Sequence, residues 1–188
     1  SNSVLGAYTA DAVNPVLTHR QLGKNYPIQN IGHADLVQTQ NGEWYAVALG
    51  IRQIEGLNPL ARETFLCKVD FENGTPIFNS GQGKVLSEME KPNLPWTPVK
   101  REPAKDEFDA DKLASKWYFV RVPTSKFYEL KNGQLALSLL PDVVDSLVNS
   151  AMIIQKTQHH SFVATTKMNF QTNKANEQAG LIYYRTAN

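Results

Sequence analysis

Two Asn-Gly dipeptides, each standing between short apolar stretches, constrain the fold of this chain more than any other sequence feature. They are Asn41-Gly42 and Asn73-Gly74. Asn-Gly is the dipeptide best suited to a type I′ turn, the turn that closes a tight β-hairpin, and we expect that turn at Asn41-Gly42. The flanking stretches are therefore predicted strands, over residues 35–40, 43–51, 64–71 and 75–78.

The second predicted strand, residues 43–51, is apolar on both faces. Tyr45 and Val47 alternate with Trp44 and Ala46. Since successive side chains of a strand point to opposite faces of its sheet, we expect this strand to be buried on both sides.

The second half of the chain has the same period-2 character. Residues 161–170 alternate over a long stretch, while residues 142–150 fit either one short helix or a surface loop. No segment has a long helical period, so the predicted class is all-β, and this strand spacing suits a propeller or a sandwich. The strands predicted here are residues 117–122, 133–140, 151–156, 161–170 and 179–185.

A proline-rich stretch separates the two halves. Residues 86–105 contain four prolines mixed with charged residues. Proline removes backbone donors and fixes φ, so we expect an extended linker there. The predicted domains are residues 1–85 and 106–188.

The overall charge excludes two classes of partner. Nineteen basic and eighteen acidic residues give a net charge of +1. This balance predicts neither nucleic-acid binding nor a polybasic membrane contact, and no apolar run has transmembrane length. Cys67 is the only cysteine, which excludes an intrachain disulfide. The bacterial cytoplasm and the periplasm both stay open as locations.

Two residues stand out as candidates for binding. His33 precedes a predicted buried hairpin, where a histidine can bind substrate, hold a metal-bound water, or bond to backbone as a structural residue. Arg62 lies where a loop enters a strand, where its guanidinium can bind a sugar hydroxyl or a carboxylate. The structural alternative for Arg62 is an ion pair with Glu63 or Glu55.

Other polar and aromatic residues give weaker signals. His159-His160 would face opposite ways on a strand, which favours packing over metal binding. The three tryptophans are more often packed than stacked on sugars. An alternating aspartate run lacks the glycine and distal glutamate of a calcium loop. The tryptophans are Trp44, Trp96 and Trp117, and the aspartates are Asp106, Asp109 and Asp111.

Several motifs, in order along nearly the whole chain, resemble glycoside hydrolase family 43 of the β-xylosidase and α-L-arabinofuranosidase type. The stretch from Gly32 to Trp44, which opens with Gly32-His33-Ala34-Asp35, resembles a late catalytic-domain motif, and Arg62-Glu63-Thr64-Phe65-Leu66 resembles the next one. The lead-in and the second half also match, over residues 14–20, 106–117, 158–170 and 179–184.

The resemblance implies part of a five-bladed β-propeller followed by the first part of a concanavalin-like β-sandwich. The implied activity is inverting hydrolysis that releases terminal xylose or arabinose from hemicellulose oligosaccharides, driven by three carboxyl groups. His33 would lie at the propeller centre near the sugar, with calcium compatible through a water. Arg62 would contact the sugar in the terminal subsite.

The chain also departs from the family pattern. The family's catalytic carboxylates precede the histidine motif, yet Asp11 is the only carboxylate residue before His33, and it matches no catalytic motif. We therefore assign no catalytic residue and predict that this chain alone is inactive. The missing blades would come from the same gene or from a companion chain. Ala61 also stands where the family has glycine, before Arg62.

Two other hypotheses remain. The chain could be a non-catalytic carbohydrate-binding or structural β-sandwich module. It could also be a truncated gene product whose exposed sheet faces drive homo-oligomers or aggregates.

Overall fold

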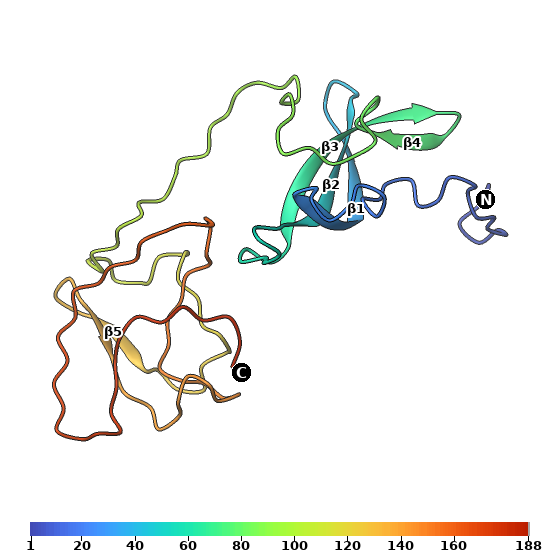
Figure 1. The fold of residues 1–188 in the computed structure, drawn as a ribbon. Coiled ribbons are helices and arrows are strands. Elements are labelled where there is room, and N and C mark those ends of the chain that lie inside the picture. Colours follow the sequence, from blue (N-terminus) through green and yellow to red (C-terminus); the bar gives the residue numbers. More distant parts are fainter. Residues whose placement is uncertain (188) are drawn as a thin grey trace. The chain divides into compact units, whose positions relative to one another are not determined.

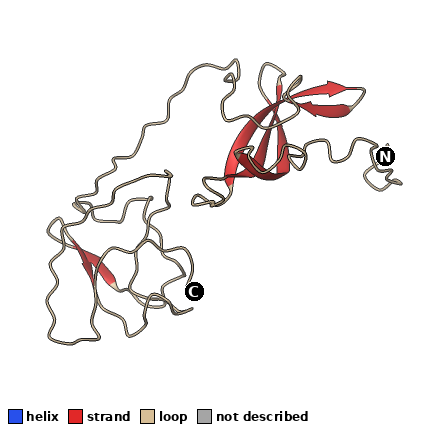
Figure 2. Ribbon diagram, viewed as in Figure 1, coloured by secondary structure: helices blue, strands red, loops and turns tan. Residues whose placement is uncertain are grey.

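The computed structural model describes residues 1–187, and the chain divides into two compact units, Ser1–Trp96 and Thr97–Asn188. The boundary falls inside the proline-rich stretch. Figure 2 shows strands and loops, and the described residues contain no helix. Accordingly, no described helix is long and apolar enough to cross a membrane. The all-β prediction is confirmed.

The first unit is built on one four-stranded antiparallel sheet in the order β1-β2-β3-β4 (Figure 1). Its strands are β1 (Ile28–Gln38), β2 (Trp44–Arg52), β3 (Glu63–Glu72) and β4 (Thr75–Phe78). Each strand pairs with the next along the chain, as in a blade of a propeller. All four predicted strands of this half are present, and β1 begins earlier than the sequence pattern indicated.

The two Asn-Gly turns differ in kind. At the β3–β4 hairpin, Asn73 and Gly74 both have positive φ, at 50° and 83°, which is the type I′ geometry. At the β1–β2 hairpin only Gly42 has positive φ, at 88°, and Gln38 pairs with Trp44, which leaves a longer loop. The type I′ prediction at Asn41-Gly42 is therefore wrong, because Thr39 closes this loop by bonding to the amide of Glu43.

The core lies on one face of this sheet. Ala46 of β2 pairs with Cys67 of β3, and both are fully buried. Leu17 and Tyr26, from the segment before β1, pack against this cluster. The buried cluster consists of Ile28, Ala46, Cys67, Val69, Phe78 and Val85.

The opposite face of β2 is only partly covered. Tyr45 is buried, but Val47, two residues later on the same face, is 37% exposed. The prediction that residues 43–51 are buried on both sides is therefore wrong at Val47, because the segments that cover the sheet pack on the Ala46 face.

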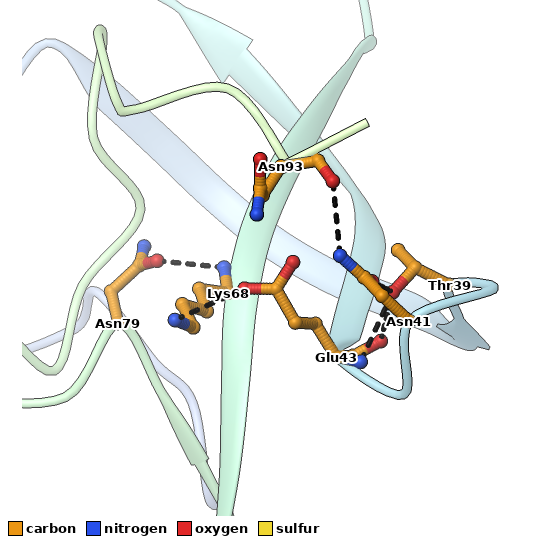
Figure 3. A network of polar contacts seen from close by, with 6 residues as sticks. All are labelled: Thr39, Asn41, Glu43, Lys68, Asn79 and Asn93. Carbon is orange, nitrogen blue, oxygen red and sulfur yellow. Dashed lines mark hydrogen bonds and ion pairs between the residues drawn. The ribbon is translucent and has the colours of Figure 1, made fainter. Parts of the chain in front are cut away.

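After β4 the chain crosses the sheet as a strap, which we define as residues 79–96. Asn79 begins it: its backbone amide donates to the Lys68 carbonyl over 2.8 Å, and its side-chain Oδ1 accepts from the Lys68 amide over 2.9 Å. Near the other end, the Asn93 carbonyl accepts a bond from Asn41 Nδ2 over 2.9 Å. Figure 3 shows the contact of Asn79 with Lys68 and that of Asn93 with Asn41. Glu43 lies between them, and its Oε1 is 3.6 Å from Lys68 Nζ. The first part of the proline-rich stretch is thus held against the first unit.

The second unit has little regular sheet. A short hairpin joins β5 (Tyr128–Leu130) to β6 (Leu135–Leu137), and one isolated bridge pairs Tyr118 with Ile154. Phe127 and Met152 are its buried apolar residues.

Several strand predictions for this half are wrong. Residues 161–170 and 179–185 lie outside any strand, and only a short part of residues 133–140 forms one. Residues 117–122 and 151–156 contribute one bridge, and residues 142–150 form a loop. Period 2 records the alternation of side chains, whereas a strand also needs a hydrogen-bonded neighbour, which these segments lack among the described residues.

An aromatic and carboxylate cluster opens the second unit. Asp106 Oδ2 accepts a 2.7 Å bond from Trp117 Nε1, and Asp106 Oδ1 accepts one from the Phe108 amide. The Trp117 ring lies 5.4 Å from that of Phe108, between centroids. The pKa of Asp106 is lowered, first by the Trp117 bond and then by the Phe108 amide. Trp117 is therefore a packed residue, held by a carboxylate.

Candidate functional site

His33 lies in a β-bulge of β1. Gly32 pairs with Leu49 and Asp35 with Val47, so two residues of β1 stand opposite one residue of β2. His33 has a φ of 57°, a left-handed conformation that is uncommon outside glycine but less so for histidine. A bulge of this kind re-aims a side chain and commonly borders functional sites. His33 is exposed and has no hydrogen-bond partner among the described residues.

A second bulge precedes it and is fixed by packing. The register shifts again between Gln29 and Gly32, where Asn30 has a φ of 54°. Ile31 of this bulge packs over Gly50 of β2, where an added Cβ would lie 2.4 Å from Ile31 Cδ1 and 3.0 Å from Phe65. Glycine is therefore needed at position 50 for Ile31 to take this place, two residues before His33.

Arg62 immediately precedes β3 and follows a structured loop. Ile54 and Leu57 exchange two backbone bonds of 2.9 Å each, and the Ala61 amide bonds to the Asn58 carbonyl. Ala61 has a φ of 55°, the left-handed conformation that glycine takes without strain. The alanine thus has the backbone conformation of a glycine position. Arg62 is exposed, and the structure shows no partner for it among the described residues.

Glu63, one of the two ion-pair partners considered for Arg62, is bound to a different arginine. Glu63 binds Arg52 in a bidentate arrangement, with Nε–Oε2 at 2.9 Å and Nη2–Oε1 at 2.6 Å. This hydrogen bonding to Glu63 raises the pKa of Arg52. This pair was not predicted from the sequence, although both residues lie at the loop-proximal ends of adjacent strands. This ion pair links the end of β2 to the start of β3, at the residue that follows Arg62.

The register relates the positions of both candidates to the same strand, β2. Leu49 of β2 pairs with Gly32 on one side and with Thr64 on the other. His33 lies in β1 between the partners of Leu49 and Val47, and Arg62 lies one residue beyond the Gly50–Glu63 pair, before β3. β1 and β3 are separated by two strand spacings of about 4.8 Å. An exposed imidazole and an exposed guanidinium on the two sides of one strand can each bind hydroxyl groups of a neutral polar ligand.

Asp11, the only carboxylate residue before His33, lies apart from both candidate residues. Asp11 Oδ2 is 3.5 Å from Thr75 Oγ1, on β4, the strand farthest from β1 in the sheet. No group of three or more histidine, cysteine, aspartate or glutamate side chains in residues 1–187 could hold a metal ion. A calcium ion near His33 therefore stays a prediction without a ligand set in this structure.

The remaining sequence candidates are mostly structural. Trp44 packs edge-on against Phe71, with ring centroids 5.6 Å apart. Trp96 is 77% exposed and so is the tryptophan that remains open. His159 is exposed and His160 is half-buried, outside any strand.

Comparisons with known proteins cover nearly the whole chain. The family described as glycosyl hydrolases family 43 matches residues 1–76, and the β-xylosidase C-terminal concanavalin A-like domain matches residues 105–188. The chain is 37% identical over 176 residues to a xylosidase/arabinosidase of Butyrivibrio fibrisolvens, covering 92% of this chain and 34% of that protein. It is 36% identical over 186 residues to a non-reducing end α-L-arabinofuranosidase of Bacteroides ovatus, covering 97% and 35%.

Solved structures agree. A xylan β-1,4-xylosidase from Bacillus halodurans C-125 superposes with a TM-score of 0.78 at 32% identity, over 85% of this chain and 31% of that one. A family 43 protein of Bacteroides ovatus gives a TM-score of 0.76 at 37% identity, over 83% and 31%. The prediction of propeller and sandwich parts is confirmed by these matches.

The chain spans about a third of the length of the curated relatives it matches, and the match runs from a catalytic-domain portion into the sandwich. It therefore belongs to glycoside hydrolase family 43, as a part that joins the late catalytic β-propeller to the concanavalin A-like domain.

Proposed function

We propose that this chain forms part of a hydrolase that releases terminal xylose or arabinose from hemicellulose oligosaccharides by inverting hydrolysis. In this proposal, the His33 and Arg62 side chains of this chain bind the sugar. The observation that carries the proposal is that these two exposed, unpartnered side chains belong to the two segments that flank β2 in a single sheet.

The two side chains suit a neutral pentose. The guanidinium of Arg62 offers several donors in a planar fork, and the imidazole of His33 offers one donor and one acceptor when neutral. Sugar hydroxyls both donate and accept, so together these groups can fix the ring orientation. The bulge at His33 and the bonded loop before Arg62 hold both backbones in place, which lowers the entropy lost on binding.

The reacting groups come from elsewhere in this proposal. Inverting hydrolysis needs a general acid and a general base whose carboxyl groups lie about 6.5–9.5 Å apart. Asp11 is remote from β1, and Glu63 is bound to Arg52. We assign the acid, the base and the residue that tunes the acid to further propeller blades, from the same gene or from a companion chain.

The open face of the sheet supports such a neighbour. Val37 of β1, which pairs with Tyr45, is 49% exposed, and Val47 of β2, on the same face, is 37% exposed. Apolar side chains gathered on one sheet region are typical of a surface that packs against another element.

A chimeric enzyme tests the proposal. The matched third of the Butyrivibrio fibrisolvens xylosidase/arabinosidase is replaced by residues 1–188 of this chain, and release of p-nitrophenol from aryl xyloside and arabinofuranoside is measured. We expect activity in the chimera and none in the isolated 188-residue chain. Arg62→Ala in the chimera should lower kcat/KM by about ten- to a hundredfold, since a charged hydrogen bond to the sugar is lost.

Arg101→Ala, in the exposed proline-rich stretch, is the matched control and should leave kcat/KM unchanged. Turnover by the isolated chain that survives repeated purification would contradict the assignment of the carboxyl groups to other polypeptide. A chimera that is fully active with Arg62→Ala and His33→Ala would contradict the sugar-binding roles.

A further inference from the structure

A buried histidine outside the candidate site joins three segments of the first unit. His19 is 4% exposed, and its Nδ1 lies 2.7 Å from the carbonyl oxygen of Ile28, at the start of β1. Its Nε2 accepts a 2.9 Å hydrogen bond from the amide of Val85, in the strap. One imidazole therefore ties the lead-in segment to β1 and to the strap at the same time.

These bonds define the state of the ring. Nε2 accepts from an amide N–H, so it carries no proton, and Nδ1 faces a carbonyl oxygen, so it carries one. The ring is thus neutral in the folded structure. A second proton on Nε2 would set two N–H groups against each other in a buried place, which replaces an attraction with a repulsion.

Tyr26 packs edge-on against His19 at 5.1 Å between ring centroids, and its hydroxyl donates to the Val85 carbonyl over 2.5 Å. The ammonium of Lys84 lies 5.2 Å from the centre of the Tyr26 ring. Cys67, in the same core cluster as Val85, has its pKa raised by burial, as does Tyr26. Near neutral pH, Lys84 is therefore the charged group of this set, and its charge has the same sign as a protonated His19.

The Lys84–Val85 peptide bond is held from both sides. The Lys84 carbonyl accepts a 2.8 Å bond from Asn79 Nδ2, and the Val85 amide donates to His19. Val85 itself is fully buried in the core cluster. The strap has separate anchors at Asn79 and Asn93, so its middle can leave the sheet while both ends stay attached.

From this geometry we propose that His19 is a pH-sensitive latch: when its ring gains a second proton, the middle of the strap around Val85 detaches from the sheet. The latch is closed at pH 8, where an ordinary histidine is neutral, and opens toward pH 5. This inference concerns the fold of the first unit and does not depend on the sugar-binding proposal.

Limited trypsin digestion of the full chain tests the latch. Cleavage at Lys84–Val85 requires local detachment, while Lys100–Arg101 in the exposed stretch reports the activity of the protease at each pH. We expect the ratio of the first cleavage to the second to rise about tenfold between pH 8 and pH 5.5, the change that loss of one buried hydrogen bond would cause. An unchanged ratio overturns the proposal.

His19→Gln separates this histidine from the others, because a glutamine amide can donate to Ile28 and accept from Val85 without titrating. In that variant the ratio should be the same at both pH values, and His159→Gln, at an exposed histidine, should keep the full response. A response that survives His19→Gln, or one removed by His160→Gln, overturns the proposal.

Nuclear magnetic resonance of the unaltered chain keeps the idea testable if His19→Gln fails to fold. The nitrogen shifts of the His19 ring should report the Nδ1–H tautomer at pH 8, and the Val85 amide should lose exchange protection at the pH where that ring titrates. A ring that titrates without any change at Val85 also overturns it.

Discussion

The two units of this chain have similar lengths and very different degrees of order in their sheets. In the first, four strands share one core cluster, with a lead-in segment and a strap packed onto the same face. In the second, two short strands and one bridge hold together long extended segments, in which Val163 is 91% and Leu181 62% exposed. A blade that folds its own flanking segments back over one face can bury a core by itself. One layer of a sandwich buries its apolar face only against a second layer.

The largest expected effect comes from the same substitution made in both units. Val69→Ala removes two buried methyl groups from the core of the sheet, where Val69 is 2% exposed. It should lower the free energy of unfolding by about 2–3 kcal/mol. Val163→Ala, at a side chain 91% exposed, should change it by no more than about 0.5 kcal/mol. Urea unfolding followed by circular dichroism measures both. Equal losses would show that the two regions do not differ in packing as described.

Substitutions at two glycines test whether the packing of Ile31 fixes the bulge in β1. Gly50→Ala forces a Cβ against Ile31 Cδ1 and Phe65, and should destabilise the first unit by about 1–3 kcal/mol. Gly32→Ala, where an added Cβ meets nothing within 4 Å, should be nearly neutral. The amide resonances of residues 31–34 should shift in the first variant and stay in place in the second. If Gly50→Ala is neutral, Ile31 does not fix the bulge.

Replacing Ala61 should have a smaller effect, in the opposite direction. Ala61 has a left-handed φ that costs an alanine about 1–2 kcal/mol, and glycine also has more freedom in the unfolded chain. We expect Ala61→Gly to raise the free energy of unfolding by about 0.5–1 kcal/mol. Thermal unfolding checks this, and a fall in stability would mean that the left-handed conformation is not maintained in solution.

The smallest expected effect is the change that acid pH causes in the second unit. Bonds from Trp117 and Phe108 lower the pKa of Asp106, so its carboxylate stabilises the fold above its ordinary titration range. That contribution is lost as the pH falls below about 4. Near-ultraviolet circular dichroism of the tryptophans should therefore change between pH 5 and pH 3, and Asp106→Asn should reduce this change. A variant that keeps the full acid response would separate Asp106 from it.

Much of the first unit could be predicted from local pattern. Alternation and the two Asn-Gly dipeptides predicted the existence and order of four strands, although β1 begins at Ile28 and not at residue 35. Adjacent strands joined by short turns need only local information. The turn type at Asn41-Gly42 could not be predicted, since Thr39 and the distant Asn93 decide the shape of that loop. The strands predicted over residues 161–170 and 179–185 failed for a related reason, because pairing depends on a neighbour that the segment itself does not specify.

The candidate residues show the same division. Motif resemblance singled out His33 and Arg62, and it noted that alanine precedes Arg62. Neither the bulge that carries His33 nor the engagement of Glu63 by Arg52 followed from motif or period. Both depend on strand register, which a difference of one residue would change.

The sequence by itself determined the all-β class, the family and the two candidate residues, because alternation, turn dipeptides and motifs are local properties of the chain. The tertiary structure alone decided that Leu49 lies between Gly32 and Thr64, which sets where His33 and Arg62 lie on the two sides of β2. It alone also placed His19 against Val85, far along the chain. Such contacts arise when backbone donors and acceptors are paired across a shared core, and the sum of that pairing and packing selects one register among many.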